Sequence, residues 1–347
     1  MAGRFLSSRM NRLKDSLFGS TEPTRNALKP WILATLPGVA MIASIGIAHL
    51  CPSSSIWGYA LQAVLFSAPP WIGLLWPAWC LVVFLRTRQK LILVMLPAGA
   101  MFVGRPMLSV PKFEPAGLKV VSANVNAFFE DRDVLEKELA ALEADLLFVI
   151  EQRAFEVDGM RRVEDNFDTD LPRISHAVAV FCRDGLSCPS HITPQIGSPT
   201  MAMPFALVRP LPEVCFVNIH APPPVPRDPT GMTPYVDWLI DRIENGRLQR
   251  DWGPCLPGDA VVVLGDLNAV PRSRPYQRLR AAGLEDPLAG SGLWGLSWPS
   301  GGGWPDFPLF RLDHVLLGGV PLSGLHHVEL TGADHLALVG WYAGSDD

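Results

Sequence analysis

Charged residues are scarce in this chain, and signatures of several protein classes are missing. Only 18% of the 347 residues are charged and 48% are apolar, a balance less polar than that of an ordinary soluble domain. None of the six cysteines belongs to a C-x-x-C pair, which argues against the common zinc sites and a thioredoxin-like motif. No repeat of about 20 to 50 residues is visible, which argues against a solenoid or a propeller.

The apolar excess lies in the first third of the chain. Trp31 to Leu50 carries no formal charge and is about as long as a helix that crosses a ~30 Å hydrocarbon core. We place a second candidate span at about Val64 to Leu85. A third, Leu91 to Leu108, is interrupted by Pro97, Gly99 and Arg105. The sequence thus predicts a membrane region over residues 31–108 with about three transmembrane helices, after a basic N-terminus at residues 1–30.

The basic residues predict an orientation in the membrane. Lys and Arg cluster before Trp31 and again at residues 86–90, whereas the connection between the first two spans has none. The positive-inside rule places both basic clusters in the cytoplasm. Three spans then put the C-terminal domain outside the cytoplasm, in a multi-pass protein of the plasma (inner) membrane. Two spans would return it to the cytoplasm, and an uncleaved signal followed by core helices is a further alternative.

Beyond a Pro-containing linker at residues 109–117, the chain becomes acidic. From Phe113 onward it has 18 Lys and Arg against 32 Asp and Glu, a net of −14, whereas the first 112 residues have a net of +9. Nonspecific nucleic-acid binding depends on phosphate neutralisation by basic residues. The acidic part is therefore not expected to bind DNA or RNA in bulk, although a nuclease is not excluded.

Two cysteines flank a predicted turn in the acidic part. Cys182 and Cys188 lie on either side of Asp184-Gly185. A disulfide can form between them if the domain lies in an oxidising compartment. Small buried thiols are at least as good an interpretation.

Apolar runs alternate with helical patterns from residue 118 onward. Continuous apolar runs are typical of strands buried on both faces. We predict strands at residues 119–125, 145–151, 177–182, 205–209, 214–220, 260–265, 310–317 and 335–341, and helices at residues 131–143, 233–250 and 274–282. This alternation predicts a layered α/β domain over residues 118–343.

One polar motif follows a strongly apolar strand. Val261 to Leu264 runs into Gly265-Asp266-Leu267-Asn268. Asp266 and Asn268 are two residues apart and therefore lie on one side of the extended chain. An aspartate there can take a proton from water, and an asparagine can hydrogen-bond a phosphate oxygen without adding repulsive charge. Alone, Asp-x-Asn after a strand is more often a turn than a site.

Further polar residues stand at the ends of other apolar runs. They are Asn124, Glu151, His220, Arg311, Asp313, Asp334 and His335. Carboxylate and amide oxygens at several strand ends suit a hard cation such as Mg²⁺. An acidic partner such as Asp313 would fix the tautomer of His335 and favour its protonated form. Taken singly, Glu151 reads as a residue emerging into solvent, and His220 is as readily structural as catalytic.

In this order and spacing, the motifs resemble the endonuclease/exonuclease/phosphatase superfamily over residues 118–342. The general layout resembles its bacterial membrane-anchored members. The matching positions are Asn124, Glu151, His220, the box from Gly265 to Asn268, Arg311-x-Asp313 and Gly332-x-Asp334-His335. The chain departs from the family pattern beside these groups, at Asn126, Ile150, His314 and Ala333.

The resemblance implies a four-layer α/β sandwich that hydrolyses phosphate esters with a metal ion. In that pattern Glu151 and Asn124 hold Mg²⁺ or Mn²⁺, and Asp334 lies near this metal or near a second metal position. The resemblance also implies that Asp266 activates the attacking water and that Asn268 and His335 bind the phosphoryl oxygens. Asp313 pairs with His335 in that pattern, and His220 stabilises the phosphate or protonates the leaving group. Substrate contacts are implied for Asn124, Asn268 and Arg311.

The substrate stays open at this point. The acidic domain and membrane tether suit a lipid headgroup or small diester better than long duplex DNA. A basic rim of Arg272, Arg274, Arg278 and Arg280 would suit nucleic acid, unless it is only the solvated face of a helix. The Trp-rich segment at residues 293–307 is either an apolar lip over the site or core packing. A non-catalytic binding or scaffold domain is the alternative function, and no protein partner is implied.

Overall fold

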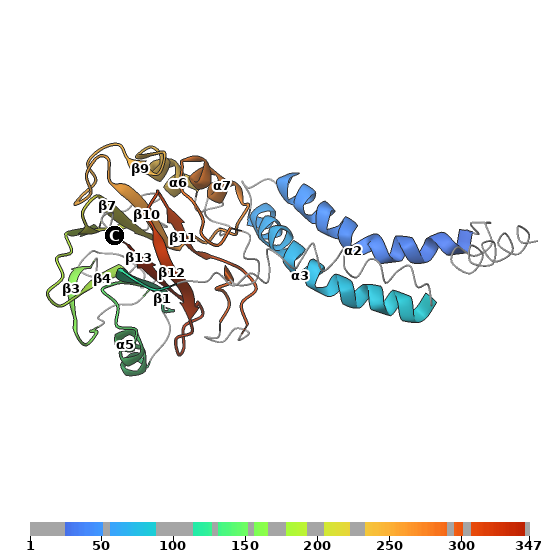
Figure 1. The fold of residues 1–347 in the computed structure, drawn as a ribbon, viewed down its shortest axis with the longest axis horizontal. Coiled ribbons are helices and arrows are strands. Elements are labelled where there is room, and N and C mark those ends of the chain that lie inside the picture. The colour runs from blue at the N-terminus through green and yellow to red at the C-terminus, as the bar shows by residue number, and fades with distance from the viewer. Residues whose placement is uncertain are drawn as a thin grey trace, which may run out of the picture. The chain divides into compact units, whose positions relative to one another are not determined.

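The computed structural model describes residues 25–50, 56–87, 114–126, 131–151, 156–165, 178–192, 205–222, 233–289, 295–300 and 307–343. The chain divides into two compact units (Figure 1). One consists of residues 1–42 with 72–102, and the other of residues 43–71 with 103–347.

Two long helices precede the sheets in the sequence, α2 (Arg25–Leu50) and α3 (Ile56–Thr87). The described residues of the first unit are 25–42 of α2 and 72–87 of α3. The indole N–H of Trp76 donates to the carbonyl of Ala34 at 2.9 Å. The Trp76 ring also lies over Gly38, where a Cβ would come within 2.7 Å of it. A small residue at position 38 therefore permits the close approach of the two helices.

The described helices do not support the predicted membrane spans. The candidate spans Trp31 to Leu50 and Val64 to Leu85 both fall on helices, α2 and α3. In the described parts of the chain, however, neither helix is at once long and apolar enough to cross a bilayer. The third candidate span at residues 91–108, most of the basic N-terminus and the linker up to residue 113 lie outside the described residues.

The first sheet joins strands from both ends of the second unit. In the described residues its order is β12-β13-β1-β2-β4-β3. The strands are β1 (Leu118–Asn124), β2 (Leu146–Ile150), β3 (Met160–Asp165), β4 (Val178–Arg183), β12 (Leu322–Val328) and β13 (Ala337–Tyr342). β1 and β2 are parallel, and the other pairs are antiparallel.

The second sheet lies in the middle of the sequence. Its described strands run β5-β6-β7-β10-β9-β8, with β11 also paired to β10. They are β5 (Ser190–Ile192), β6 (Phe205–Leu211), β7 (Val214–Ile219), β8 (Ile243–Glu244), β9 (Arg247–Leu248), β10 (Ala260–Asp266) and β11 (Asp313–Leu317). β7 and β10 are parallel, and β11 returns antiparallel to β10.

Three apolar cores give the second unit four layers. Leu135 and Leu139 of α5 (Arg132–Ala141) pack on the outer face of the first sheet. A second core, with Phe148 and Phe216, fills the space between the sheets. Helices α6 (Thr233–Ile240) and α7 (Arg274–Ala281) cover the second sheet. Figure 1 shows α5 on one side of the sheets and α6 and α7 on the other, which confirms the predicted four-layer sandwich.

The parallel strand pairs explain where the polar residues gather. Parallel neighbours end at the same edge of a sheet. β1 and β2 end at Asn124 and Ile150, which are in register, and Glu151 follows. In β7 and β10, Asn218 lies opposite Leu264. His220 and Asp266 each follow two residues later. Two pairs of polar residues thus emerge at one end of the sandwich.

The predicted helix over residues 233–250 is wrong in its second half. α6 ends at Ile240, and the chain then turns through Asn245-Gly246 between β8 and β9. Both turn residues have positive φ, 51° and 76°, as a two-residue Asn-Gly hairpin requires. Ile243 and Leu248 are buried in the core beneath the hairpin. Because both residues are apolar and have helical spacing, they extend the apolar pattern of α6 in the sequence, although their backbone is extended.

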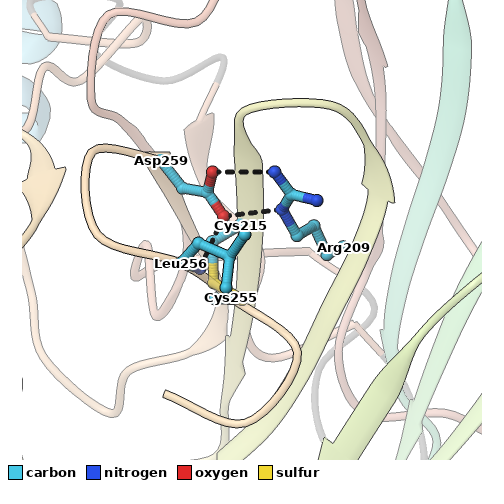
Figure 2. The surroundings of a disulfide bond; sticks show 5 residues. All are labelled: Arg209, Cys215, Cys255, Leu256 and Asp259. Atoms are coloured by element: carbon cyan, nitrogen blue, oxygen red, sulfur yellow. Dashed lines mark hydrogen bonds and ion pairs between the residues drawn. A yellow bond between two sulfur atoms is a disulfide. The ribbon is translucent and has the colours of Figure 1, made fainter. Parts of the chain in front are cut away.

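Two disulfides close loops in the second unit. Of the two interpretations of Cys182 and Cys188, the disulfide is the one present in the structure. A second bridge, which the sequence did not predict, joins Cys215 of β7 to Cys255 across 40 residues. Beside it, Asp259 accepts hydrogen bonds from the Arg209 side chain at 2.8 and 3.2 Å (Figure 2). The bridge and the ion pair together fasten the loop that leads into β10.

Candidate active site

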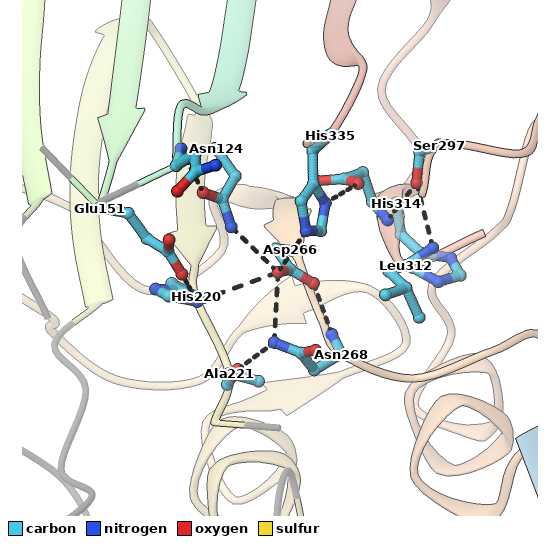
Figure 3. A network of polar contacts seen from close by, with 12 residues as sticks. Asn124, Glu151, His220, Ala221, Asp266, Asn268, Ser297, Leu312, His314 and His335 are labelled. Atoms are coloured by element: carbon cyan, nitrogen blue, oxygen red, sulfur yellow. Dashed lines mark hydrogen bonds and ion pairs between the residues drawn. The ribbon is translucent and has the colours of Figure 1, made fainter. Parts of the chain in front are cut away.

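The carboxylate of Asp266 lies at the centre of the polar cluster. Asp266 ends β10 and is 1% exposed. Its Oδ1 accepts from the backbone N–H of Asn268 at 2.8 Å. Its Oδ2 accepts from the side-chain amides of Asn124 and Asn268, each at 3.2 Å (Figure 3). Three donors from two residues, Asn124 and Asn268, therefore fix the orientation of this carboxylate.

The backbone turns sharply immediately around Asp266. Gly265 has φ +118°, and a Cβ there would lie 2.3 Å from the carbonyl oxygen of Ile219. Only glycine lets β10 approach β7 this closely. Ala221 then donates its N–H to the carbonyl of Asp266, and the Asn268 amide donates back to the carbonyl of Ala221, each at 2.8 Å. The segment from Asp266 to Asn268 is therefore both a hydrogen-bonded turn and part of the polar site.

Two histidines flank the Asp266 carboxylate. His220 Nε2 lies 3.9 Å from Asp266 Oδ2 and 3.2 Å from Glu151 Oε1. On the other side, His335 Nε2 lies 3.7 Å from the same Oδ2. Figure 3 shows both rings turned toward the carboxylate. The arrangement places one buried anion between two groups that can carry a proton.

The second histidine is held by an aspartate. His335 Nδ1 lies 2.8 Å from Asp313 Oδ2. The hydroxyl of Ser297, which is fully buried, accepts from the backbone N–H groups of Leu312 and Asp313 at 3.1 and 3.0 Å. The predicted pairing of Asp313 with His335 is present in the structure, and Ser297 fixes the backbone that carries Asp313.

Mutual charge sets the protonation of this group. Burial raises the pKa of Asp266 to about 6, with His335 opposing the rise and Asp313 adding to it. Burial alone would lower the pKa of His335, but Asp313 and Asp266 outweigh it and raise this pKa to about 10. For Asp313, burial is outweighed by His335, which lowers its pKa. At neutral pH, Asp266 and Asp313 are ionised and His335 is an imidazolium.

His220 also favours its protonated form. Burial disfavours the charge, yet the hydrogen bond to Glu151 and the charges of Glu151 and Asp266 raise the pKa of His220. Its Nδ1 is buried and has no hydrogen-bond partner among the described residues. Glu151 itself has a positive φ of 70° directly after β2, and its side chain is 21% exposed. It therefore reaches from the strand end toward solvent and toward His220.

Asp334 lies close enough to Glu151 for their charges to interact. Burial raises the pKa of Asp334, His335 opposes this, and Glu151 raises it further. A hydrogen bond from Trp298 favours the ionised form. Two like charges at the mouth of a site are stabilised when a cation lies near both.

One cluster in the described residues has the spacing of a metal site. Asp266, Asp313 and His335 each offer a ligand atom, and these atoms lie within 4.8 Å of one another. All three residues are buried. This set differs from the metal ligands that the sequence predicts, which are Asn124, Glu151 and Asp334.

Arg311, predicted to contact substrate, lies elsewhere. Its buried guanidinium pairs with Asp286 and donates to the carbonyl of Leu288 at 3.1 Å. Asp286 also accepts from the hydroxyl of Tyr276. The structure therefore places Arg311 in a buried ion pair outside the group around Asp266.

The described residues of the basic rim and of the Trp-rich segment have different surroundings. Arg272 and Arg274 are exposed, and Arg278 pairs with Asp237. Trp298 packs beside His335 with ring centroids 6.4 Å apart. The other tryptophans of residues 293–307, at positions 294 and 304, lie outside the described residues.

One protein family matches the part of the sequence that carries the site. A sequence model of the endonuclease/exonuclease/phosphatase family matches residues 121–346. No curated protein sequence matches the chain significantly.

Several solved structures are similar to the chain at low identity. An AP endonuclease from Archaeoglobus fulgidus has 14% identity and a TM-score of 0.45, covering 65% of this chain and 99% of that one. TDP2 from Caenorhabditis elegans has 15% identity and a TM-score of 0.45, covering 83% and 94%. An endonuclease/exonuclease/phosphatase from Beutenbergia cavernae has 16% identity and a TM-score of 0.43, covering 64% and 70%. We draw nothing about substrate from such distant likenesses.

The family match covers well over half of the chain, and its residues include every polar group of the site. The chain therefore belongs to the endonuclease/exonuclease/phosphatase family, with a buried Asp-Asp-His cluster in a phosphoester-hydrolase fold.

Proposed function

We propose that this protein is a metal-dependent phosphoester hydrolase in which Asp266 activates the attacking water. The observation that carries the proposal is the single buried carboxylate held between His220 and His335. A general base works best when its pKa lies near the operating pH. With a pKa of about 6, Asp266 is ionised at neutral pH and basic enough to accept a proton from water.

The groups around Asp266 suit a phosphoryl group in transfer. The His335 imidazolium can donate to a phosphoryl oxygen. The Asn268 amide already donates to Ala221 and Asp266, so it would exchange one of these hydrogen bonds for one to the phosphate. Fixed donors aimed at developing charge stabilise a transition state without reorganisation. Because Asp313 keeps His335 protonated, the donor is present before substrate arrives.

His220 is placed to act on the other side of the carboxylate. It faces Glu151 and Asp266, and its pKa is raised. A protonated imidazole there can stabilise the phosphate or donate a proton to the leaving oxygen. Asn124 orients Asp266 through its Nδ2, and its Oδ1 accepts from the backbone N–H of Asn126 at 3.4 Å.

A hard cation fits the residues that the sequence predicts for it. Asn124, Glu151 and Asp334 offer one amide and two carboxylate groups, the donors that Mg²⁺ or Mn²⁺ prefers, with waters completing the shell. A bound Mg²⁺ would neutralise charge on the phosphate and lower the pKa of coordinated water.

The cluster of Asp266, Asp313 and His335 is the less suitable metal site. His335 Nδ1 lies 2.8 Å from Asp313 Oδ2, and the raised pKa of His335 favours an imidazolium, which has no lone pair to offer a metal. A metal on this cluster would have to displace a proton from His335. We therefore assign the metal to Asn124, Glu151 and Asp334.

Among substrates we favour a small phosphodiester or a lipid headgroup over long nucleic acid. The residues from Phe113 onward have a net charge of −14, which repels a polyanion. Arg278 of the basic rim is paired with Asp237. Initial rates on phospholipid vesicles, single-stranded DNA and bis-p-nitrophenyl phosphate, compared at equal phosphate concentration, distinguish these classes. Faster cleavage of the DNA would overturn the preference.

A non-catalytic scaffold is the alternative function. Hydrolysis of bis-p-nitrophenyl phosphate with Mg²⁺ tests between the two, using Asp266→Ala and His335→Ala as inactive controls and the exposed Asp184→Ala as a matched control. We expect turnover by the wild type and Asp184→Ala only. A folded protein that binds Mg²⁺ but turns over no ester would support the scaffold.

We also propose attachment to the plasma (inner) membrane, with the domain at residues 118–343 outside the cytoplasm. The distribution of Lys and Arg supports this orientation, and two disulfides suit an oxidising compartment. Large apolar side chains such as Val39, Ile42 and Leu75 are 60%, 69% and 63% exposed on α2 and α3. Alkaline carbonate extraction of cell membranes tests attachment. Recovery of the full chain in the soluble fraction would contradict it.

A further inference from the structure

A hydrogen bond between two polar side chains crosses the apolar layer between the two sheets. Asn218 Nδ2 donates to Ser122 Oγ at 2.8 Å. Asn218 lies on β7 of the second sheet and Ser122 on β1 of the first. Both are buried, at 1% and 3% exposure.

The pair is surrounded by apolar side chains. Ser122 is in register with Phe148 on one side and Leu338 on the other. Asn218 is in register with Leu264 and Ala206. All four of these neighbours belong to the core between the sheets. Polar groups in such surroundings lower stability unless they are paired, and Asn218 Oδ1 has no hydrogen-bond partner among the described residues. An apolar pair of similar size at these positions would therefore be expected to give a higher free energy of unfolding.

The position of the pair relative to the site explains its presence. Along a strand, residues i and i+2 point to the same face. Two residues after Ser122 comes Asn124, and two residues after Asn218 comes His220. On each sheet, the residue that makes this hydrogen bond therefore lies on the same face as a site residue and two positions before it in the chain.

The contacts that complete the site also cross between the sheets. Asn124 of the first sheet donates to Asp266 of the second at 3.2 Å. Glu151, at the end of β2, lies 3.2 Å from His220, at the end of β7. Both distances depend on how the sheets are placed, and apolar packing alone fixes sliding of one sheet over another less strictly than a directional bond does.

We propose that Ser122 and Asn218 are positioning residues: their hydrogen bond holds the two sheets in the relative placement that the catalytic groups need. This inference rests on the proposed phosphoester hydrolysis for its effect on rate, but its geometric part does not. A displacement of about 1 Å in reacting groups can lower a rate by roughly 10²-fold.

A double-mutant design separates positioning from simple stability. Ser122→Ala and Asn218→Leu each leave one buried polar group unpaired, so each is expected to lower the melting temperature and kcat. The double variant replaces both partners with apolar groups of similar shape, which is nearly neutral for stability. We expect its melting temperature to return close to that of the wild type while kcat stays at least about tenfold lower, with little change in KM.

Two further variants act as controls. Ser122→Thr keeps the hydroxyl and is expected to keep wild-type kcat. Val262→Ala shortens a side chain in the same layer without touching the hydrogen bond, so it should lower the melting temperature but not kcat. A loss of kcat in Val262→Ala equal to that in the double variant would mean that general loosening suffices, which overturns the proposal.

The deciding measurement is the distance between Glu151 Oε1 and His220 Nε2 in crystal structures of the full-length wild type and the double variant. The proposal predicts that this distance, 3.2 Å here, lengthens in the double variant together with the loss of kcat. An unchanged distance, or a longer one with wild-type kcat, overturns it. If the wild type itself hydrolyses no ester, the proposed function fails, and the distance alone then decides whether the pair positions the two sheets.

Discussion

His335 and Asp266 set each other's charge. Their nearest atoms, Nε2 and Oδ2, lie 3.7 Å apart in a buried site. The imidazolium lowers the pKa of the carboxyl, which burial raises, and the carboxylate raises the pKa of the imidazole. A base and a cationic donor are therefore both present at neutral pH, which the proposed hydrolysis needs.

The pH dependence of kcat/KM should show two limits. With a pKa of about 6, Asp266 is protonated at lower pH, so the rate should fall as pH drops through about 6. With a pKa of about 10, His335 loses its proton at higher pH, so the rate should fall again there. Rates on a soluble diester from pH 4 to pH 11 check this. A constant rate down to about pH 4, the ordinary range of Asp, would contradict the role of Asp266.

His335→Gln should move the acidic limit of that profile. Loss of the imidazolium removes a charge that lowers the pKa of Asp266. The residual activity should therefore need a higher pH than the wild type to reach its plateau. The same rate measurements on this variant test the coupling, and an acidic limit at the wild-type position would refute it.

Asp313→Asn should weaken His335 as a cationic donor. Asp313 is the largest influence that raises the pKa of His335. Without its charge, the alkaline limit should move to lower pH, and kcat should fall by roughly 10²- to 10³-fold, as for loss of one fixed donor to developing charge. Asp184→Asn, an exposed acid, is the matched control. An alkaline limit that does not move would argue against the assigned pairing.

Arg311 should matter for stability. Removal of one partner from a buried ion pair typically costs about 3–5 kcal/mol. Arg311→Met should lower the free energy of unfolding by this order near neutral pH, and Arg311→Met with Asp286→Leu should recover much of it. Urea unfolding followed by circular dichroism measures both. A raised KM with unchanged stability would restore the sequence-based prediction that Arg311 contacts substrate.

The Arg311 effect should also depend on pH. Burial opposes ionisation of Asp286, but Arg311 outweighs it and the pKa of Asp286 is lowered. A lowered pKa stabilises the fold above the unfolded pKa, about 4, and the contribution is lost as pH falls through the folded value. The difference between wild type and Arg311→Met should therefore shrink in acid.

The two disulfides should differ in what they contribute. Loop closure across 40 residues is worth about 4 kcal/mol in the chain-entropy model, against about 2 kcal/mol for six residues. Replacement of Cys215 and Cys255 by Ala should thus lower the free energy of unfolding more than replacement of Cys182 and Cys188. Equal losses would show that loop length does not govern these bridges.

The sequence predicted the strands that carry the site because these strands are buried. β1, β2, β7 and β10 are apolar runs, and each ends at or just before a polar residue that the structure brings into the cluster, namely Asn124, Glu151, His220 and Asp266. A change from apolar to polar residues is visible in a sequence without knowledge of partners.

The strands that sequence reasoning missed lie at the edges. β3, β5 and β12 are edge strands of their sheets, and edges carry charged or polar residues that hide the apolar pattern. Met160–Asp165 contains two arginines and two acids. The Asn245-Gly246 hairpin was missed because Ile243 and Leu248, which flank it, are buried and have the spacing of apolar residues on one face of a helix.

Relations between distant residues could not be read from the sequence. Cys215 and Cys255 are 40 residues apart, and Ser122 and Asn218 are 96 apart. Ser122 and Asn218 each interrupt an apolar run two residues before a site residue, which is the one local sign of their role. Arg311 shares a motif with Asp313, but it points to Asp286 instead of the site.

Mg²⁺-dependent hydrolysis of bis-p-nitrophenyl phosphate by the wild type and Asp266→Asn tests the central claim most directly. The asparagine keeps the shape of the side chain and removes the base. We predict turnover by the wild type that EDTA abolishes and Mg²⁺ restores. We also predict a loss of at least about 10²-fold in Asp266→Asn, the size of a general-base contribution, in a variant that circular dichroism shows to be folded at the assay temperature. Wild-type rates in Asp266→Asn, or rates indifferent to EDTA, would contradict the account.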